Sequence, residues 1–283
     1  FGVSQFSTPR KNRGLALSAD GNFLYAGYTD KPVRKIDLRV SDYIDAAVAE
    51  TWASNGKAIA VDDVGRVYLA GDHAIVIADA DLAGVLYTIN TGADYTCEGV
   101  AVRRESGVLA VYGTECQGSN RLTRWELTED AGAITAHAAA GLDGDGVVTV
   151  AAGSDMRGLT IDDVGRIWIA DNDGKVIRIN ADGSADTSVD MSSYGDQYAI
   201  AFRAGRAYVT NGAARTISVL DMDLNVLETI TTPLADMKLD ENDGNWTGIA
   251  MIPDGSGFYL ATNSAQTADE KSYYGRCDDQ SDA

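Results

Sequence analysis

The sequence has few of the residues from which most catalytic and metal centres are built. Among 283 residues it has two histidines and three cysteines. A Ser-His-Asp triad or a histidine-based metal site therefore has little material, and the cysteines lack the CxxC spacing of zinc sites. No apolar run reaches the roughly 20 residues that a membrane-spanning helix needs, so we expect no membrane insertion.

Basic residues are also scarce. The 23 lysines and arginines face 42 aspartates and glutamates, which gives a formal net charge of −19. Such a balance repels phosphates, so nucleic acid is not an expected partner. An acidic surface keeps a protein soluble at high salt, and we predict an extracellular or cell-surface location.

Glycine and short strand-forming runs are abundant instead, and they form a repeat. The 30 glycines, with many Val, Ile, Tyr and Thr residues in short runs, favour an all-β protein. A Gly or Ala, an apolar strand, a polar turn and a second apolar strand recur from residues 14, 58, 99, 158, 199 and 248. Examples are "AIAVDDVGRVYLAG", "GLTIDDVGRIWIAD" and "GIAMIPDGSGFYLATN". The spacings between these starts are 44, 41, 59, 41 and 49 residues. A period of about 40 to 50 residues is typical of propellers.

The repeat predicts a six-bladed β-propeller with four-stranded antiparallel blades. Small residues at the start of each first strand suit the crowded centre of such a ring. The last repeat lacks an obvious fourth strand, and residues 1–8 alternate like an outer strand. We therefore expect residues 1–283 to form one domain, with residues 1–8 completing the last blade.

Two segments carry a resemblance to known repeat families. "AYVTNGAARTISVLDMDLNVLETI" resembles the YVTN repeat of surface-layer-type propellers, and "GLTIDDVGRIWIADNDGKVIRIN" is similar to NHL and gluconolactonase-like repeats. The gluconolactonase-like resemblance implies a divalent metal held in the channel by Asn, Asp and Glu side chains, where it activates water or polarises a carbonyl. The corresponding positions here are mainly Arg, Lys, Tyr and Thr, so most of those ligands are missing.

Propeller topology places one residue of each blade at the mouth of the central channel. These are the residues just before the inner strands: Arg13, Lys57, Glu98, Arg157, Tyr198 and Thr247. Three cations at one mouth predict a site for an anionic ligand, because guanidinium groups bind carboxylates through two hydrogen bonds. The alternative is that the cations pair with loop acids of the same chain, which are Asp72, Glu98, Glu115, Asp171 and Asp173.

Several acidic turns have the oxygen-rich composition that calcium prefers. The segments "DNDG" and "DENDGN" supply Asp171, Asp173, Asp240 and Asp243 as candidate ligands. The alternative is an ordinary turn, because Asp, Asn and Gly also dominate turns without metal. The duplicated "DDVGR" at residues 62–66 and 162–166 connects first and second strands, so we interpret it as a tight turn rather than as a catalytic pair.

The cysteines allow one local prediction. Cys97 lies just ahead of the third inner strand and Cys116 just after the second strand of that blade, so antiparallel pairing brings them to one end of a hairpin. We predict a disulfide there, which would indicate an oxidising compartment. Two buried thiols are the alternative, and Cys277 has no evident partner.

These observations favour a non-catalytic binding or assembly module over an enzyme. No convincing nucleophile, general base or metal set appears at the channel, so we expect no cofactor unless calcium occupies a turn. The expected partner is a protein or a small anionic ligand, or further copies of the chain. Two other functions stay open: a metal-dependent lactonase or related hydrolase, and a structural subunit of a surface layer, filament or virus particle.

Overall fold

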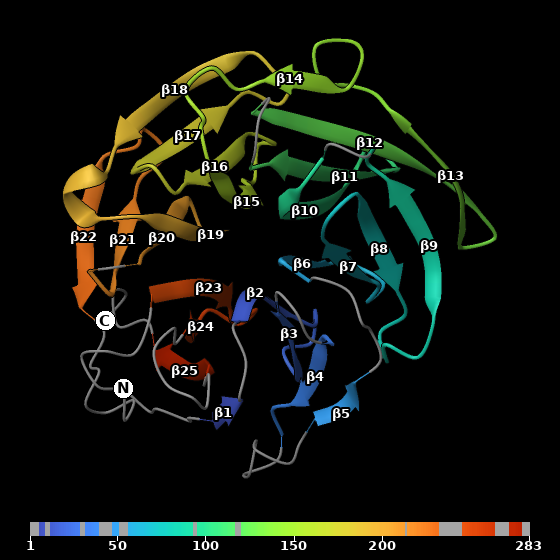
Figure 1. The fold of residues 1–283 in the computed structure, drawn as a ribbon, viewed down its shortest axis with the longest axis horizontal. Helices are drawn as coiled ribbons and strands as arrows, with labels where there is room; N and C mark the ends of the chain where they lie inside the picture. The colour runs from blue at the N-terminus through green and yellow to red at the C-terminus, as the bar shows by residue number, and fades with distance from the viewer. Residues whose placement is uncertain are drawn as a thin grey trace.

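The chain forms an all-β propeller in which antiparallel sheets surround a central opening (Figure 1). This computed structural model describes residues 6–8, 12–28, 32–39, 47–50, 56–92, 95–116, 120–212, 214–231, 245–263 and 272–278. The regular elements among them are strands and one short 3-10 helix, η1 (Ser192–Tyr194). No helix in the described part of the chain has the length and apolar character to cross a bilayer.

Five blades are each made from a continuous stretch of chain that runs from an inner strand to an outer one. The first two contain β2 (Asn12–Leu17), β3 (Phe23–Tyr28), β4 (Arg34–Asp37) and β5 (Ala47–Glu50), then β6 (Ala58–Val61), β7 (Val67–Ala70), β8 (Ala74–Ala78) and β9 (Val85–Asn90). The third contains β10 (Cys97–Glu105), β11 (Val108–Glu115), β12 (Arg121–Asp130), β13 (Ala133–Ala139) and β14 (Val147–Thr149). The fourth and fifth contain β15 (Met156–Ile161), β16 (Ile167–Asp171), β17 (Lys175–Ile179) and β18 (Ala185–Asp190), then β19 (Gln197–Arg203), β20 (Arg206–Asn211), β21 (Thr216–Leu220) and β22 (Val226–Thr231).

A sixth sheet, which is described in part, joins strands from both ends of the chain. It contains β23 (Asn245–Met251), β24 (Gly257–Asn263), β25 (Ser272–Asp278) and, outermost, β1 (Phe6–Thr8). Phe6 pairs with Tyr274 and Thr8 with Ser272. This pairing agrees with the predicted role of the N-terminal segment, of which residues 1–5 lie outside the described residues.

The third blade departs from the predicted four strands. The long strand β12 pairs with β13 over residues 125–130 and with β14 over residues 121–123. Because β11 occupies the other edge of β12, β13 and β14 share the outer position, and the segment between them forms an excursion. This excursion explains the longer spacing between the third and fourth repeats.

Small residues begin the inner strands because neighbouring inner strands approach closely. A Cβ atom on Gly14 would lie 2.9 Å from the Cα atom of Ala58, and one on Gly158 would lie 2.9 Å from the Cα atom of Ala199. Protein interiors do not accommodate such overlaps without backbone movement. The glycine at these positions is therefore a requirement of the crowded axis, as the sequence predicted.

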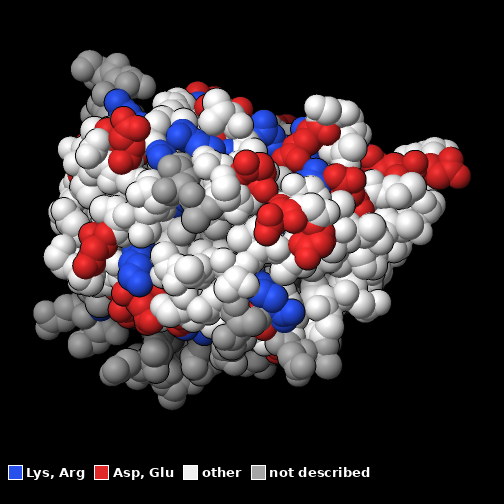
Figure 2. Space-filling model, turned by 90° about the horizontal axis from the view of Figure 1, so that it is seen from above, with Lys and Arg blue, Asp and Glu red and all other residues white. Residues whose placement is uncertain are grey.

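Apolar side chains fill the spaces between blades, whereas buried charged side chains such as Asp162 and Asp171 are held by hydrogen bonds. Trp168 of the fourth blade packs with Ile200 and Val209 of the fifth, and its side chain is fully buried. In the edge-on view of Figure 2, acidic side chains are spread over the rim of the ring with basic side chains among them. The ring is thus held by apolar contacts between adjacent blades.

The duplicated DDVGR segment forms the same turn in the second and fourth blades. In each copy the first aspartate accepts hydrogen bonds from the backbone N–H groups two and four residues further on. Its second oxygen accepts from the arginine Nε, at 2.6 Å between Asp62 and Arg66 and at 2.7 Å between Asp162 and Arg166. The two glycines have φ angles of 90° and 93°, which suit glycine. The predicted turn is confirmed.

We expect Asp162→Ala to lower the free energy of unfolding by about 2–4 kcal/mol, because it removes the buried acceptor of Arg166 and of the Trp168 indole N–H. Denaturant unfolding at neutral pH measures this loss. The matched control is Asp163→Ala, whose exposed side chain predicts a change below about 0.5 kcal/mol. Equal losses in the two variants would contradict the assignment.

The same pair of variants has an expected pH dependence. Burial raises the pKa of Asp162, but the hydrogen bonds from Trp168 and Arg166 outweigh it, so this pKa is lowered. A carboxyl with a depressed folded pKa stabilises the fold above its unfolded pKa of about 3.9, and this contribution is lost as the pH falls through the folded value. The stability difference between wild type and Asp162→Ala should therefore narrow below about pH 4.

Candidate functional site at the channel mouth

Irregular pairing at the start of the inner strands places the predicted mouth residues. In β2, β10, β15 and β23 the pairing skips one residue, and the skipped residues are Arg13, Glu98, Arg157 and Thr247. In β19 the shift covers Tyr198 and Ala199, and Lys57 directly precedes β6. A β-bulge leaves its extra residue outside the ladder and redirects the side chain. Here the redirected side chains belong to the residues around the channel axis.

All six predicted residues line one cavity at the mouth. The cavity is also lined by the first residues of the inner strands that follow them, and its volume is about 60 Å³. This volume holds a few water molecules, whereas typical small-molecule pockets measure roughly 300–1,000 Å³. The structure thus brings the predicted residues together around a small space.

Glu98 is the centre of charge at this mouth. Its Oε1 lies 3.3 Å from Lys57 Nζ, and its Oε2 lies 3.5 Å from Arg13 Nη1 and 3.7 Å from Arg157 Nε. Only 9% of the Glu98 side chain is exposed. One shielded carboxylate therefore interacts with three cations that come from three different blades.

Two of the cations have a second acid. Lys57 Nζ lies 2.9 Å from Asp72 Oδ1, and Arg157 donates two hydrogen bonds to Asp155 at 3.1 and 2.7 Å. Burial would lower the pKa of Lys57, but the contacts with Asp72 and Glu98 outweigh it and raise this pKa. The pKa of Arg157 is also raised, because the contacts with Asp155 and Glu98 outweigh the effect of burial. Both groups are therefore firmly cationic.

The cations at the mouth thus pair with acids of the same chain, which was the alternative to a ligand site. Among the loop acids named from the sequence, Asp72 and Glu98 take part in this pairing. Glu115 instead contacts Arg121 at 2.8 Å. Tyr198 lies under the Arg157 guanidinium, 5.0 Å from ring centre to carbon, and Thr247 is buried at the cavity wall.

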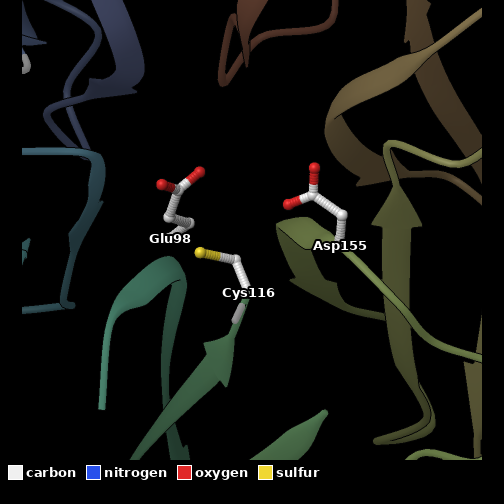
Figure 3. A group of neighbouring side chains, drawn as sticks. All are labelled: Glu98, Cys116 and Asp155. Atoms are coloured by element: carbon white, nitrogen blue, oxygen red, sulfur yellow. The ribbon is translucent and has the colours of Figure 1, made fainter. Parts of the chain in front are cut away.

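Glu98, Cys116 and Asp155 form the one described group with the composition of a metal site. Their ligand atoms lie within 4.8 Å of one another. Figure 3 shows the Cys116 sulfur beside the Glu98 side chain, with the Asp155 carboxyl across from them. One thiolate and two carboxylates would form a three-ligand set like those of catalytic zinc sites.

The surroundings do not fit a divalent cation. Both carboxylates already interact with cations, and the pKa of Cys116 is raised to about 12 by burial and by the negative charge and hydrogen bonding of Glu98. A metal would need the thiolate and would lie among three positive side chains, which repel it. The lactonase mechanism implied by the resemblance therefore has no suited metal centre in these residues.

The predicted disulfide between Cys97 and Cys116 is not formed, and both are free buried thiols. The physical reason is the strand register. Cys97 pairs with Glu115, so Cys116 lies one residue further along, and successive side chains of a strand point to opposite faces. Cys97 accordingly packs in the core between the second and third blades, whereas Cys116 faces Glu98. The thiols give no information about the redox compartment, and Cys277 has no described side chain.

The calcium candidates that the structure describes serve as turn acceptors. Asp171 is fully buried and accepts hydrogen bonds from the backbone N–H groups of Ser154 and Asp173. Asp173 accepts from the Ser154 hydroxyl. These bonds are those of an ordinary polar turn. Asp240 and Asp243 lie outside the described residues.

Sequence reasoning did not identify Asp155 and Cys116 as parts of the mouth. The available signal for Asp155 was its position two residues before Arg157, because side chains two apart on a strand share a face. The signal for Cys116 was its place directly after β11, where that blade returns to the mouth. Both signals were weak, since neither the bulge nor the distance between blades can be seen in the sequence.

Comparisons with known proteins identify the fold. No protein-family model and no curated protein matches the chain. Among solved structures, a Bacteroides caccae protein of unknown function has a TM-score of 0.61 at 13% identity and covers 87% of this chain and 84% of its own. The RRP9 WD40 repeats have a TM-score of 0.63 at 12% identity, covering 97% and 99%. A nidogen/laminin complex structure has 0.61 at 15%, covering 86% and 85%.

These similarities show a β-propeller and nothing finer. The three identities are too low to transfer a function, because propellers carry both enzymes and binding modules. The YVTN and NHL resemblances have no support from the family models. The mouth must therefore be interpreted from its own geometry.

We expect Glu98→Gln to lower the free energy of unfolding by about 2–4 kcal/mol, because it removes the shared counter-charge of three cations. We also expect inorganic phosphate to restore part of the lost stability, since an anion can then neutralise Arg13, whose Nε is buried without a hydrogen-bond partner. Thermal unfolding with and without phosphate measures both effects.

The control for this experiment is Asp72→Asn, which removes one acid from Lys57 but leaves Glu98 in place. It should cost less stability, and phosphate should raise its melting temperature no more than that of the wild type. A phosphate effect of equal size in wild type and both variants would show that Glu98 does not occupy an anion position.

Proposed function

We propose that this protein is a non-catalytic binding and assembly module, displayed on the outside of a cell or particle. The observation that carries the proposal is the internal pairing of charge at the mouth. The three cations of the predicted site have acidic partners in the same chain. The channel mouth then serves to join blades, and partners contact the faces or rim of the ring.

The chemistry of the mouth supports a non-catalytic role. A cysteine nucleophile needs the thiolate form, and a pKa of about 12 keeps Cys116 protonated near neutral pH. A general base must have its carboxylate free to reach a substrate, whereas the Glu98 carboxylate contacts Lys57, Arg13 and Arg157. Asp155 is held by both Arg157 and Asn172. The best-placed candidate groups are therefore committed to structural contacts.

The predicted anionic ligand at the mouth receives less support than the module itself. Such a ligand would have to displace Glu98 from its three cations and enter a cavity of about 60 Å³. The energy of the existing ion pairs opposes that exchange. A protein partner, or another copy of the chain, remains the partner that this geometry favours.

The acidic surface supports assembly that depends on salt. A net charge of −19 makes copies of the chain repel one another when ionic strength is low. Molar salt shortens the Debye length to about 3 Å, so short-range contacts then decide whether the copies associate. This behaviour would suit a subunit of a surface layer, filament or particle.

The proposal predicts association without catalysis. Sedimentation velocity should show larger species as protein concentration and salt are raised together. In parallel, lactones and phosphoesters should not be hydrolysed above the buffer rate in the presence of calcium, zinc or manganese.

Two results would overturn this proposal. The first is a strict monomer at every salt and protein concentration that also binds no partner. The second is metal-dependent turnover that disappears in Glu98→Gln while that variant stays folded. The Asp163→Ala variant serves as the matched control for turnover, because Asp163 lies in the turn after β15 and does not line the mouth.

A further inference from the structure

A larger cavity, which we call the funnel, lies at the other end of the central channel. Its volume of about 620 Å³ falls within the roughly 300–1,000 Å³ of small-molecule sites. Three consecutive residues of each inner strand line it: residues 15–17, 59–61, 100–102, 159–161, 200–202 and 249–251. All of these residues are apolar except Thr160.

The funnel wall also has polar character from the backbone. Each inner strand stands at the end of its sheet and has a hydrogen-bonded strand on one side only. The other edge faces the opening of the ring (Figure 1). Many of the apolar side chains pack between the blades, so backbone edges form much of the wall, and its exposed surface is more polar than apolar. The wall therefore offers hydrogen-bonding groups beside apolar contacts.

Arg103 adds a positive charge to this wall. Its Nη1 and Nη2 donate to the carbonyl oxygens of Asp162 and Asp163 at 3.0 and 3.4 Å. Both acceptors are neutral, and among the described residues no acid forms an ion pair with Arg103. A guanidinium has five N–H donors, so donors remain for a ligand. This contrasts with the mouth, where each cation has an acid.

The two acids beside Arg103 differ in their availability. The Asp162 carboxylate is bonded to Arg166 and Trp168 and is fully buried. Asp163 is exposed, and its carboxylate has no described partner. Asp162 and Asp163 also line the funnel, but the Asp162 carboxylate is already paired with Arg166, and water screens the charge of the exposed Asp163.

We propose that the funnel binds a small amphipathic organic anion. Its apolar body lies against the inner strands, and its carboxylate or sulfonate accepts hydrogen bonds from Arg103. The cavity volume matches a whole small molecule, which favours a free ligand over a segment of a protein. The funnel adjoins the mouth, because one residue of each inner strand lines both cavities, but none of the six predicted mouth residues lines the funnel. The proposal does not depend on assembly of the chain.

Arg203 provides a matched control for Arg103. It lies four residues after Ala199, as Arg103 lies four residues after Gly99, so the two arginines occupy the same position in the repeat. Arg203 also donates to a backbone carbonyl of the next blade, that of Ile252. It does not line the funnel. Loss of Arg203 removes a similar structural contact without removing the proposed ligand contact.

The test uses two fluorescent probes with the same aromatic body. The anionic probe is 1-anilinonaphthalene-8-sulfonate, and the neutral probe is N-phenyl-1-naphthylamine. We expect one site per folded chain for the anionic probe. Arg103→Gln should weaken its binding about tenfold or more and should change binding of the neutral probe less than about twofold, because only the sulfonate uses the guanidinium. Arg203→Gln should bind both probes like the wild type.

A second variant tests the place of binding. Ala60→Glu puts a carboxylate on the funnel wall and should also weaken the anionic probe, while Asp163→Asn should leave it unchanged or strengthen it. Melting temperatures establish that each variant is folded. The proposal fails if the folded wild type does not bind the anionic probe, if Arg103→Gln and Arg203→Gln bind it equally, or if Ala60→Glu has no effect.

Discussion

The close approach of the inner strands at the propeller axis is the constraint on which the other features depend. A side chain on Gly14 or Gly158 would overlap the backbone of the next inner strand. The chain meets this constraint with small residues, and it places a bulged residue directly before most of them. Because the bulged residue leaves the ladder, long polar side chains can turn toward the axis at a point where ordinary strand positions have no room. The mouth is thus a consequence of the crowding.

The pairing of charges at the mouth follows from the same close approach of the inner strands. Side chains from different blades meet there at short range, so unlike charges have to be balanced locally. Glu98 does this for Arg13, Lys57 and Arg157, and Asp72 and Asp155 complete the pairing. Of these three cations, Arg13 has the least complete hydrogen bonding, since its Nε is buried without a hydrogen-bond partner. The network joins the first four blades by contacts that are partly shielded from water.

The sequence predicted those features that repeat and missed those that occur once. The period of the strands, the small residues at their starts and the DDVGR turns recur, so each copy supports the others. The split outer position of the third blade occurs once and appeared only as a long spacing. The predicted disulfide was wrong because Cys97 pairs with Glu115, one residue before Cys116. The spacing of residues in a sequence does not determine strand register to within one residue.

The sequence predicted six residues of the candidate site, but not whether their charges are paired. The six residues predicted from their position at the inner strands all line the mouth cavity, whereas Asp155 and Cys116 were not predicted. Whether their cations are free or paired depends on distances of 3 to 4 Å between side chains of different blades, and no periodic pattern encodes such distances. Asp155 shows this most clearly, because its role rests on a two-residue offset in one blade.

The two ends of the channel differ because the inner strands use different residue types along their length. At the mouth, bulged polar residues meet and neutralise one another around a space of about 60 Å³. At the funnel the strands carry apolar residues in regular register, so side chains stay between the blades and leave about 620 Å³ open. The carbonyl oxygens that Arg103 contacts lie in a turn whose buried carboxylate is already paired with Arg166. Both aspartates of this turn line the funnel, but Asp162 is paired with Arg166, and no acid among the described residues forms an ion pair with Arg103.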